Sequence, residues 1–160
     1  MASNYDFKLD SNRIKFRLPA ETRIRKGLQA LPAAIEEVEI LQNSFEGFYG
    51  FNEQASERQF KDIAPDYSII HLAMHGLLDA ENAMTSSLAF TENGDSSQDN
   101  FLHAFELMHL NMNADLVVLS ACETGLGEVA KGEGVLSLAR SFAYAGVPSM
   151  IMTLWGVNDM

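Results

Sequence analysis

A histidine and a cysteine each follow an apolar run of the chain. His75 and Gly76 come after Ile69–Met74, and Cys122 comes after Leu116–Ala121. Because the carboxyl ends of neighbouring parallel strands share one edge of a sheet, strands over these runs would bring the imidazole and the thiol together. An imidazole beside a thiol can accept its proton, which creates a thiolate nucleophile, and can later protonate a leaving amine. The spacing therefore predicts a Cys–His dyad for nucleophilic catalysis.

Helical and strand-like patterns alternate along the chain that must position this dyad. Apolar residues spaced by three and four predict helices, and continuous apolar runs predict buried strands. We expect helices over Leu31–Phe48, Asn52–Ile63, Phe101–Leu110 and Val135–Ala145, and strands over Tyr67–Met74, Ser86–Thr91, Asp115–Ala121 and Val147–Leu154. The strand over Ser86–Thr91 is expected at an edge because its alternation is weak. Strands that alternate with helices indicate an α/β fold with a parallel sheet covered on both faces.

Four ordered motifs in this sequence resemble those of the CHAT domain, a branch of the caspase-like cysteine peptidases related to separase. The motifs are His75-Gly76, Ser120–Gly125, Gly132–Arg140 and Leu154–Asp159. The resemblance extends from about Ala34 to Asp159. It implies a caspase-like three-layer sandwich, in which helices flank a mostly parallel sheet.

The resemblance also implies roles for individual residues. His75 would be the general base and Cys122 the nucleophile of a cysteine endopeptidase that cleaves a protein or peptide substrate. The backbone amides of Gly76 and Cys122 would form an oxyanion hole, whose N–H donors stabilise the charge that develops on the tetrahedral intermediate. Relatives that cleave after Arg or Lys have an acidic residue where this chain has Ser120. We therefore expect Ser120 and Glu123 to contact the substrate, with no preference for either charge.

The composition and length fit one domain with an N-terminal extension. The chain has 160 residues, of which 47% are hydrophobic, enough for a core of its own. We expect residues 1–30 to be a solvated basic arm and residues 31–160 to be the CHAT domain. The basic residues of the arm are Arg13, Lys15, Arg17, Arg23, Arg25 and Lys26. Relatives continue past the last motif, so we expect the domain to be truncated at its C-terminus and to self-associate or to pair with another polypeptide.

Charge and cysteine content limit the function classes. The formal net charge of −11 argues against general binding to nucleic acid. Cys122 is the only cysteine, so the chain has no internal disulfide. It also has no apolar run long enough to span a bilayer and no apolar segment of a signal peptide. These features predict a cytoplasmic protein without a membrane partner.

Two other kinds of site are weaker matches to the sequence. His71 and His75 are about 13 Å apart if both lie on one strand, too far to bind a single zinc ion. The loop Gly125–Ala130 fits the dinucleotide pattern G-x-G-x-x-A, but Gly132 and Gly134 interrupt the helix that should follow. We therefore expect neither a metal nor a cofactor.

Two functions other than an endopeptidase remain open from the sequence. The first is a catalytically silent caspase-like domain that serves as an interaction module or scaffold. The second is another acyl-transferring cysteine enzyme, because the same dyad and oxyanion hole serve any acyl transfer.

Overall fold

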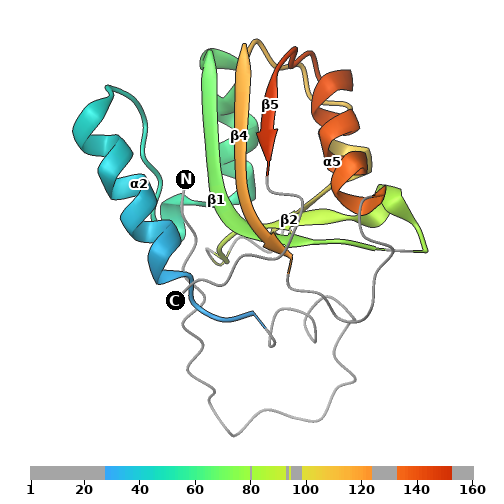
Figure 1. Ribbon diagram of the computed structural model, residues 1–160, viewed down its shortest axis with the longest axis horizontal. Helices are drawn as coiled ribbons and strands as arrows, with labels where there is room; N and C mark the ends of the chain where they lie inside the picture. The colour runs from blue at the N-terminus through green and yellow to red at the C-terminus, as the bar shows by residue number, and fades with distance from the viewer. Residues whose placement is uncertain (1–27, 80, 93, 95–98, 124–132, 153–160) are drawn as a thin grey trace, which may run out of the picture.

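The computed structural model describes residues 28–79, 81–92, 94, 99–123 and 133–152. Within them, one five-stranded sheet has the order β3-β2-β1-β4-β5 (Figure 1). The strands are β1 (Ile69–Leu77), β2 (Ser87–Ala89), β3 (Phe101–His103), β4 (Leu116–Glu123) and β5 (Met150–Met152). The pairs β1–β4 and β4–β5 are parallel, whereas β1–β2 and β2–β3 are antiparallel. The fold is thus mixed α/β, and the prediction of a mostly parallel sheet is wrong for β2 and β3.

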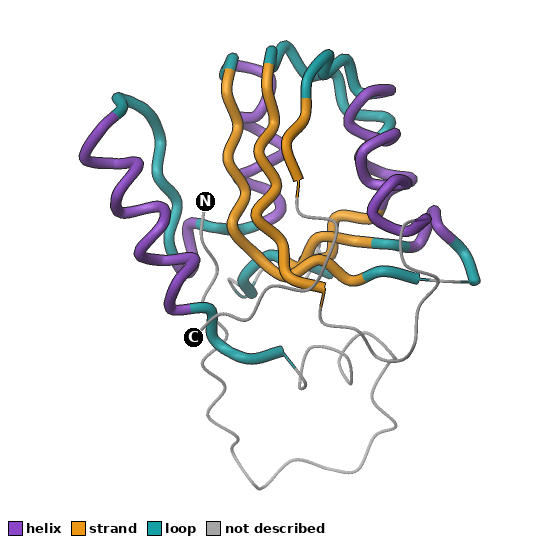
Figure 2. The backbone as a smooth tube through the Cα atoms, in the orientation of Figure 1, coloured by secondary structure: helices purple, strands orange, loops and turns teal. Residues whose placement is uncertain are grey.

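Four α-helices and three short 3-10 helices accompany the sheet in the described part of the chain. The α-helices are α2 (Pro32–Ser44), α3 (Glu57–Ile63), α4 (Ala104–Leu107) and α5 (Glu133–Tyr144). The 3-10 helices are Asn52–Gln54, Ala64–Asp66 and Ala83–Thr85. Figure 2 shows α2 and α5 on opposite sides of the group formed by β1, β4 and β5.

Helices pack on both faces of β1. On one face, β1 and β4 contribute alternate residues to a core that also contains side chains from α3, α4 and α5. The members of this core include Ile70, Leu72, Met74, Val117, Leu119, Phe60, Leu107, Leu138 and Phe142. On the other face, Ala73 of β1 packs against Leu31, Ala34 and Val38, of which the last two lie on α2. A strand covered on both faces needs apolar residues at successive positions, which explains the continuous apolar run that ends at Met74.

The structure changes three of the predicted elements. Phe101–His103 was expected to start a helix but is the strand β3, because it pairs with β2 and buries both Phe101 and Leu102. The strand β2 is also not at an edge, since it lies between β1 and β3 and is buried throughout. The helix expected over Asn52–Ile63 is divided, because Ser56 accepts a hydrogen bond from the Gln59 amide (3.3 Å) and begins α3 as its N-cap.

The remaining predicted elements agree with the structure. The helices α2 and α5 and the strands β1 and β4 lie where the apolar patterns place them. The fourth expected strand is present as β5, and its predicted continuation past Met152 lies outside the described residues. Three further predicted segments also lie outside the described residues: the arm up to residue 27, the loop Gly125–Ala130 and the motif Leu154–Asp159.

Candidate active site

The strands β1 and β4 form the longest ladder of the sheet. It runs from Ile69 opposite Leu116 to Gly76 opposite Glu123. In this register His75 lies directly opposite Cys122. Because neighbouring strands are about 4.8 Å apart, the backbones of these two residues are adjacent. The structure therefore brings together the histidine and the cysteine that the sequence singles out.

The imidazole of His75 is buried and held by a backbone carbonyl. His75 is only 2% exposed, and its Nε2 is 2.7 Å from the carbonyl oxygen of Gln29. A carbonyl oxygen can only accept a hydrogen bond, so Nε2 carries the proton and donates it. Because a neutral imidazole has one N–H, this contact makes Nδ1 the basic nitrogen.

The segment that supplies this carbonyl is fixed at both ends. Gln29 lies between Leu28 and Leu31, both of which are buried. Leu28 packs near Leu77 at the end of β1, whereas Leu31 packs against Ala73. These two apolar contacts hold the backbone of residue 29 beside His75. The orientation of the imidazole thus depends on the short segment that precedes α2.

The other predicted site residues surround this pair along the two strands. Gly76 is buried and lies between Glu123 of β4 and Leu88 of β2. Ser120 is half-buried and lies opposite Ala73. Glu123 is the last residue of β4. The side chains of Cys122 and Glu123 lie outside the part of the chain that the structure describes.

A hydrogen-bonded turn follows the histidine strand. Oδ1 of Asp79 accepts hydrogen bonds from the amides of Glu81 (2.9 Å) and Asn82 (3.0 Å), and Oδ2 accepts one from Oγ1 of Thr85 (2.6 Å). The Thr85 hydroxyl and these two amides hold the pKa of Asp79 below its ordinary value. Asp79 therefore shapes the loop between β1 and β2 and is committed to contacts within that loop.

His71 joins β1 to α2. Its Nε2 is 3.1 Å from Oε1 of Glu37. Burial lowers the pKa of His71 below its ordinary value, although the nearby carboxylate of Glu37 acts in the opposite direction. His71 thus has the environment of a structural residue that links the sheet to α2.

The remaining histidines also make local contacts. Nδ1 of His103 is 3.0 Å from the carbonyl oxygen of Thr85, and its amide donates to the Glu106 carboxylate (3.1 Å). Nδ1 of His109 is 2.6 Å from the carbonyl oxygen of Phe105. Within the described residues, no three or more His, Cys, Asp or Glu side chains are grouped as they would be around a metal ion.

Sequence reasoning missed two groups that shape the site, the carbonyl of Gln29 and the carboxylate of Asp79. The Gln29 carbonyl has no sequence signal, because every residue carries a carbonyl and only the fold places this one beside His75. Asp79 had a usable signal, since an aspartate at the start of a polar loop commonly accepts hydrogen bonds from the amides that follow. Its carboxylate organises the turn through these hydrogen bonds.

The protein has a mixed α/β fold in which the strand that carries His75 pairs in parallel with the strand that carries Cys122. The chain belongs to the CHAT domain family, which it matches over residues 10–160. This confirms the resemblance drawn from the four motifs, and the matched range includes residues 10–30, the greater part of the expected arm. CHAT domains are related to cysteine peptidases. No curated protein matches the chain. No helix in the described residues has the length and apolar character needed to cross a membrane.

Proposed function

We propose that this chain is a CHAT-type cysteine endopeptidase in which His75 and Cys122 form the catalytic dyad. The observation that carries the proposal is the register of β1 and β4, which sets these two residues opposite each other. Because alternate positions of a strand share one face of the sheet, position 122 falls on the same face as Val118 and Ser120 of β4. These two residues pair with His71 and Ala73 of β1. The helices on both faces of β1 further support a caspase-like three-layer arrangement.

The hydrogen bond to Gln29 assigns the nitrogen that acts as base. With its proton held at Nε2, His75 accepts the thiol proton of Cys122 at Nδ1. The resulting thiolate attacks the carbonyl carbon of the substrate, so a C–S bond forms and the carbonyl oxygen takes the negative charge. The amides of Gly76 and Cys122 are proposed to stabilise that charge.

Collapse of the intermediate completes the cleavage. The C–N bond breaks as Nδ1–H of His75 donates its proton to the leaving amine. Water, deprotonated by the same nitrogen, then attacks the thioester and releases the new carboxyl group and the thiol. Ser120 and Glu123 are proposed to contact the substrate because both lie on β4 within two residues of Cys122.

Labelling with an electrophilic peptide probe tests the dyad. The wild-type chain should be labelled at Cys122, and Cys122→Ala should not be labelled. His75→Gln should be labelled at least about a hundredfold more slowly than wild type, because a general base contributes about 10² to 10⁴ in rate. Equal labelling rates for wild type and His75→Gln would remove the dyad from the mechanism.

One observation favours a second function, a catalytically silent interaction domain. His75 is almost completely buried among the described residues, whereas a working base must reach a substrate. In this case Cys122 would be alkylated with the pH profile of an ordinary thiol. In an active dyad, the imidazolium lowers the thiol pKa, and alkylation stays fast well below pH 8. The pH dependence of alkylation therefore discriminates the two functions.

A further inference from the structure

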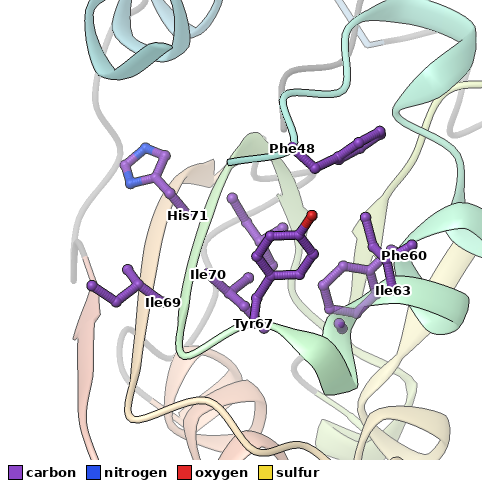
Figure 3. A pocket seen from close by; sticks show the side chains of 9 residues that line it. Phe48, Phe60, Ile63, Tyr67, Ile69, Ile70 and His71 are labelled. Carbon is purple, nitrogen blue, oxygen red and sulfur yellow. The ribbon is translucent and has the colours of Figure 1, made fainter. Parts of the chain in front are cut away.

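A pocket on β1 lies at the end of the strand away from the dyad. It is lined by Phe48, Phe60, Ile63, Ala64, Tyr67 and the strand residues Ile69–Leu72 (Figure 3). His75 and Gly76 follow Leu72 by about 10 to 13 Å at the rise of a strand. The surroundings of these two residues are set instead by the other end of β1, where the chain leaves the strand after Leu77.

A short ladder joins this end of β1 to β2. Gly76 lies opposite Leu88, and Leu77 lies opposite Ser87. Residues 78–86, the β1–β2 loop, connect the two strands. In a hairpin the loop fixes the register of one strand against the other, and here the ladder that assists it is short. The β1–β2 loop therefore holds the backbone of Gly76, whose amide is a proposed donor of the oxyanion hole.

Two hydrogen bonds to side chains continue the pairing into the loop. The amide of Asp79 donates to Oγ of the buried Ser86 (3.0 Å), and Oγ1 of Thr85 donates to Oδ2 of Asp79 (2.6 Å). The Thr85 hydroxyl also lies 2.7 Å from the carbonyl oxygen of Asn82. Because a hydrogen bond to a charged group is roughly twice as strong as a neutral one, the carboxylate of Asp79 is its main acceptor. Both bonds of Asp79 thus join the start of the loop to its end.

The end of the loop is anchored in turn to the start of α4. Nδ1 of His103 donates to the carbonyl oxygen of Thr85 (3.0 Å), and the amide of Ala104 donates to the carbonyl oxygen of Ser86 (2.8 Å). Ala104 is the first residue of α4 and is buried. Thr85 and Ser86 are therefore fixed points, and their bonds to Asp79 carry this fixed position to the chain that leaves β1.

We propose that Thr85 is a positioning residue of the active site, because its hydroxyl holds the loop that places the Gly76 amide for oxyanion binding. This inference rests on the proposed function, in which that amide stabilises the tetrahedral intermediate. Thr85 acts through Asp79 and Gly76. Loss of its hydroxyl should let Gly76 shift, which weakens oxyanion binding, while the long β1–β4 ladder keeps His75 opposite Cys122.

Two small reagents applied to the full chain separate the oxyanion hole from the dyad. p-Nitrophenyl acetate acylates a thiolate: the C–S bond forms through a tetrahedral oxyanion, and the C–O bond then breaks to release p-nitrophenolate. Iodoacetamide alkylates the same thiolate by displacing iodide, so no oxyanion forms. Because Cys122 is the only cysteine, Cys122→Ala supplies the background rate for both reagents.

Thr85→Val keeps the shape of the side chain but removes the hydroxyl. It should slow acylation at least about tenfold, while alkylation stays within about twofold of wild type. Thr85→Ser restores the donor and should bring acylation back to within about threefold of wild type. The matched control is Thr91→Val, because Thr91 is buried just past the other end of β2 and its hydroxyl has no hydrogen-bond partner within the described residues. This control should leave both rates unchanged.

The pattern of rates distinguishes failure of this inference from failure of the proposed function. Acylation of Thr85→Val at the wild-type rate would overturn the inference and leave the dyad intact. Equal losses of acylation and alkylation would overturn it as well, because Thr85 would then only support the fold. Alkylation of wild type and His75→Gln at the same rate would remove the dyad and this inference together.

Hydrogen exchange provides a readout that needs no reaction at Cys122. The amides of Leu77–Asp79 should exchange at least about tenfold faster in Thr85→Val than in wild type, because the loop loses a bond that joins its two ends. The amides of Val117–Leu119 in β4 should be unchanged, which shows that the sheet is intact. Wild-type exchange at Leu77–Asp79 in this variant would overturn the role of the Thr85 hydroxyl.

Discussion

Replacement of His75 by alanine should destabilise the fold as well as remove the proposed base. The imidazole is buried, and its Nε2–H is the hydrogen-bond donor to the Gln29 carbonyl. Truncation leaves that carbonyl without this donor, which costs about 1 to 3 kcal/mol, and it leaves a cavity in place of the ring. We therefore expect the free energy of unfolding to fall by about 2 to 4 kcal/mol.

His75→Gln separates stability from chemistry. The amide nitrogen of glutamine can occupy the place of Nε2 and donate to the same carbonyl, so this variant should recover about 1 kcal/mol or more relative to His75→Ala. An amide cannot act as a general base. Peptidase activity should therefore be lost in both variants, by about 10² to 10⁴ in rate for the missing base.

Urea unfolding followed by far-ultraviolet circular dichroism measures the two stabilities, and a peptide-cleavage assay on the same samples measures the rates. For a chain of this length, 2 to 4 kcal/mol corresponds to a decrease in melting temperature of about 4 to 16 °C. A loss below about 0.5 kcal/mol in His75→Ala, within the usual range for exposed sites, would refute the structural part of this reasoning. Equal stability of the alanine and glutamine variants would refute the role assigned to the Gln29 contact.

Three further predictions concern the structure around the site. Lys61→Met should lower the free energy of unfolding by about 2 to 4 kcal/mol, because it leaves the carboxylate of Glu57, which is 1% exposed, without its cation. Arg58→Met, at an exposed position of the same helix, should lower it by less than about 0.5 kcal/mol. Unfolding midpoints of the two variants measure the difference. Burial lowers the pKa of His71 below 6.5, so the folded chain binds a proton less readily than the unfolded chain does. Wild type should therefore lose stability relative to His71→Gln as the pH falls below 6.5. Parallel plots of the free energy of unfolding against pH for the two proteins would contradict this. Gly146→Ala should lower the free energy of unfolding by about 1 to 3 kcal/mol, because φ is +107° and a Cβ would lie 2.8 Å from a backbone oxygen. Thermal unfolding measures the loss, and a variant as stable as wild type would show that this turn relaxes.

A network of charges explains the size of the effect expected at Lys61. Its ammonium group contacts carboxylate oxygens of both Glu57 and Glu106, and so joins α3 to α4. Burial acts to lower the pKa of Lys61, but the hydrogen bonds to these two carboxylates outweigh it and raise the pKa above its ordinary value. The cation is therefore retained at neutral pH, and its removal leaves a buried anion.

The sequence by itself determined where the histidine and cysteine strands lie and that they run side by side. Two apolar runs that end at His75 and Cys122 can be buried on both faces only in the centre of a sheet, and parallel pairing then brings their ends to one edge. Local patterns sufficed here because each run is long and uniformly apolar. The same holds for α2 and α5, whose apolar residues recur with helical spacing.

Only the tertiary structure decided the short elements and the support of the imidazole. The three residues of β3 are too few to show a period, so pairing with β2 overrides the helical spacing of Phe101 and Phe105. The carbonyl of Gln29 lies 46 residues from His75 in sequence, and a backbone oxygen has no residue type by which to recognise it. Its position depends on the burial of Leu28 and Leu31 against distant strands, which is a property of the packed core and not of any local segment.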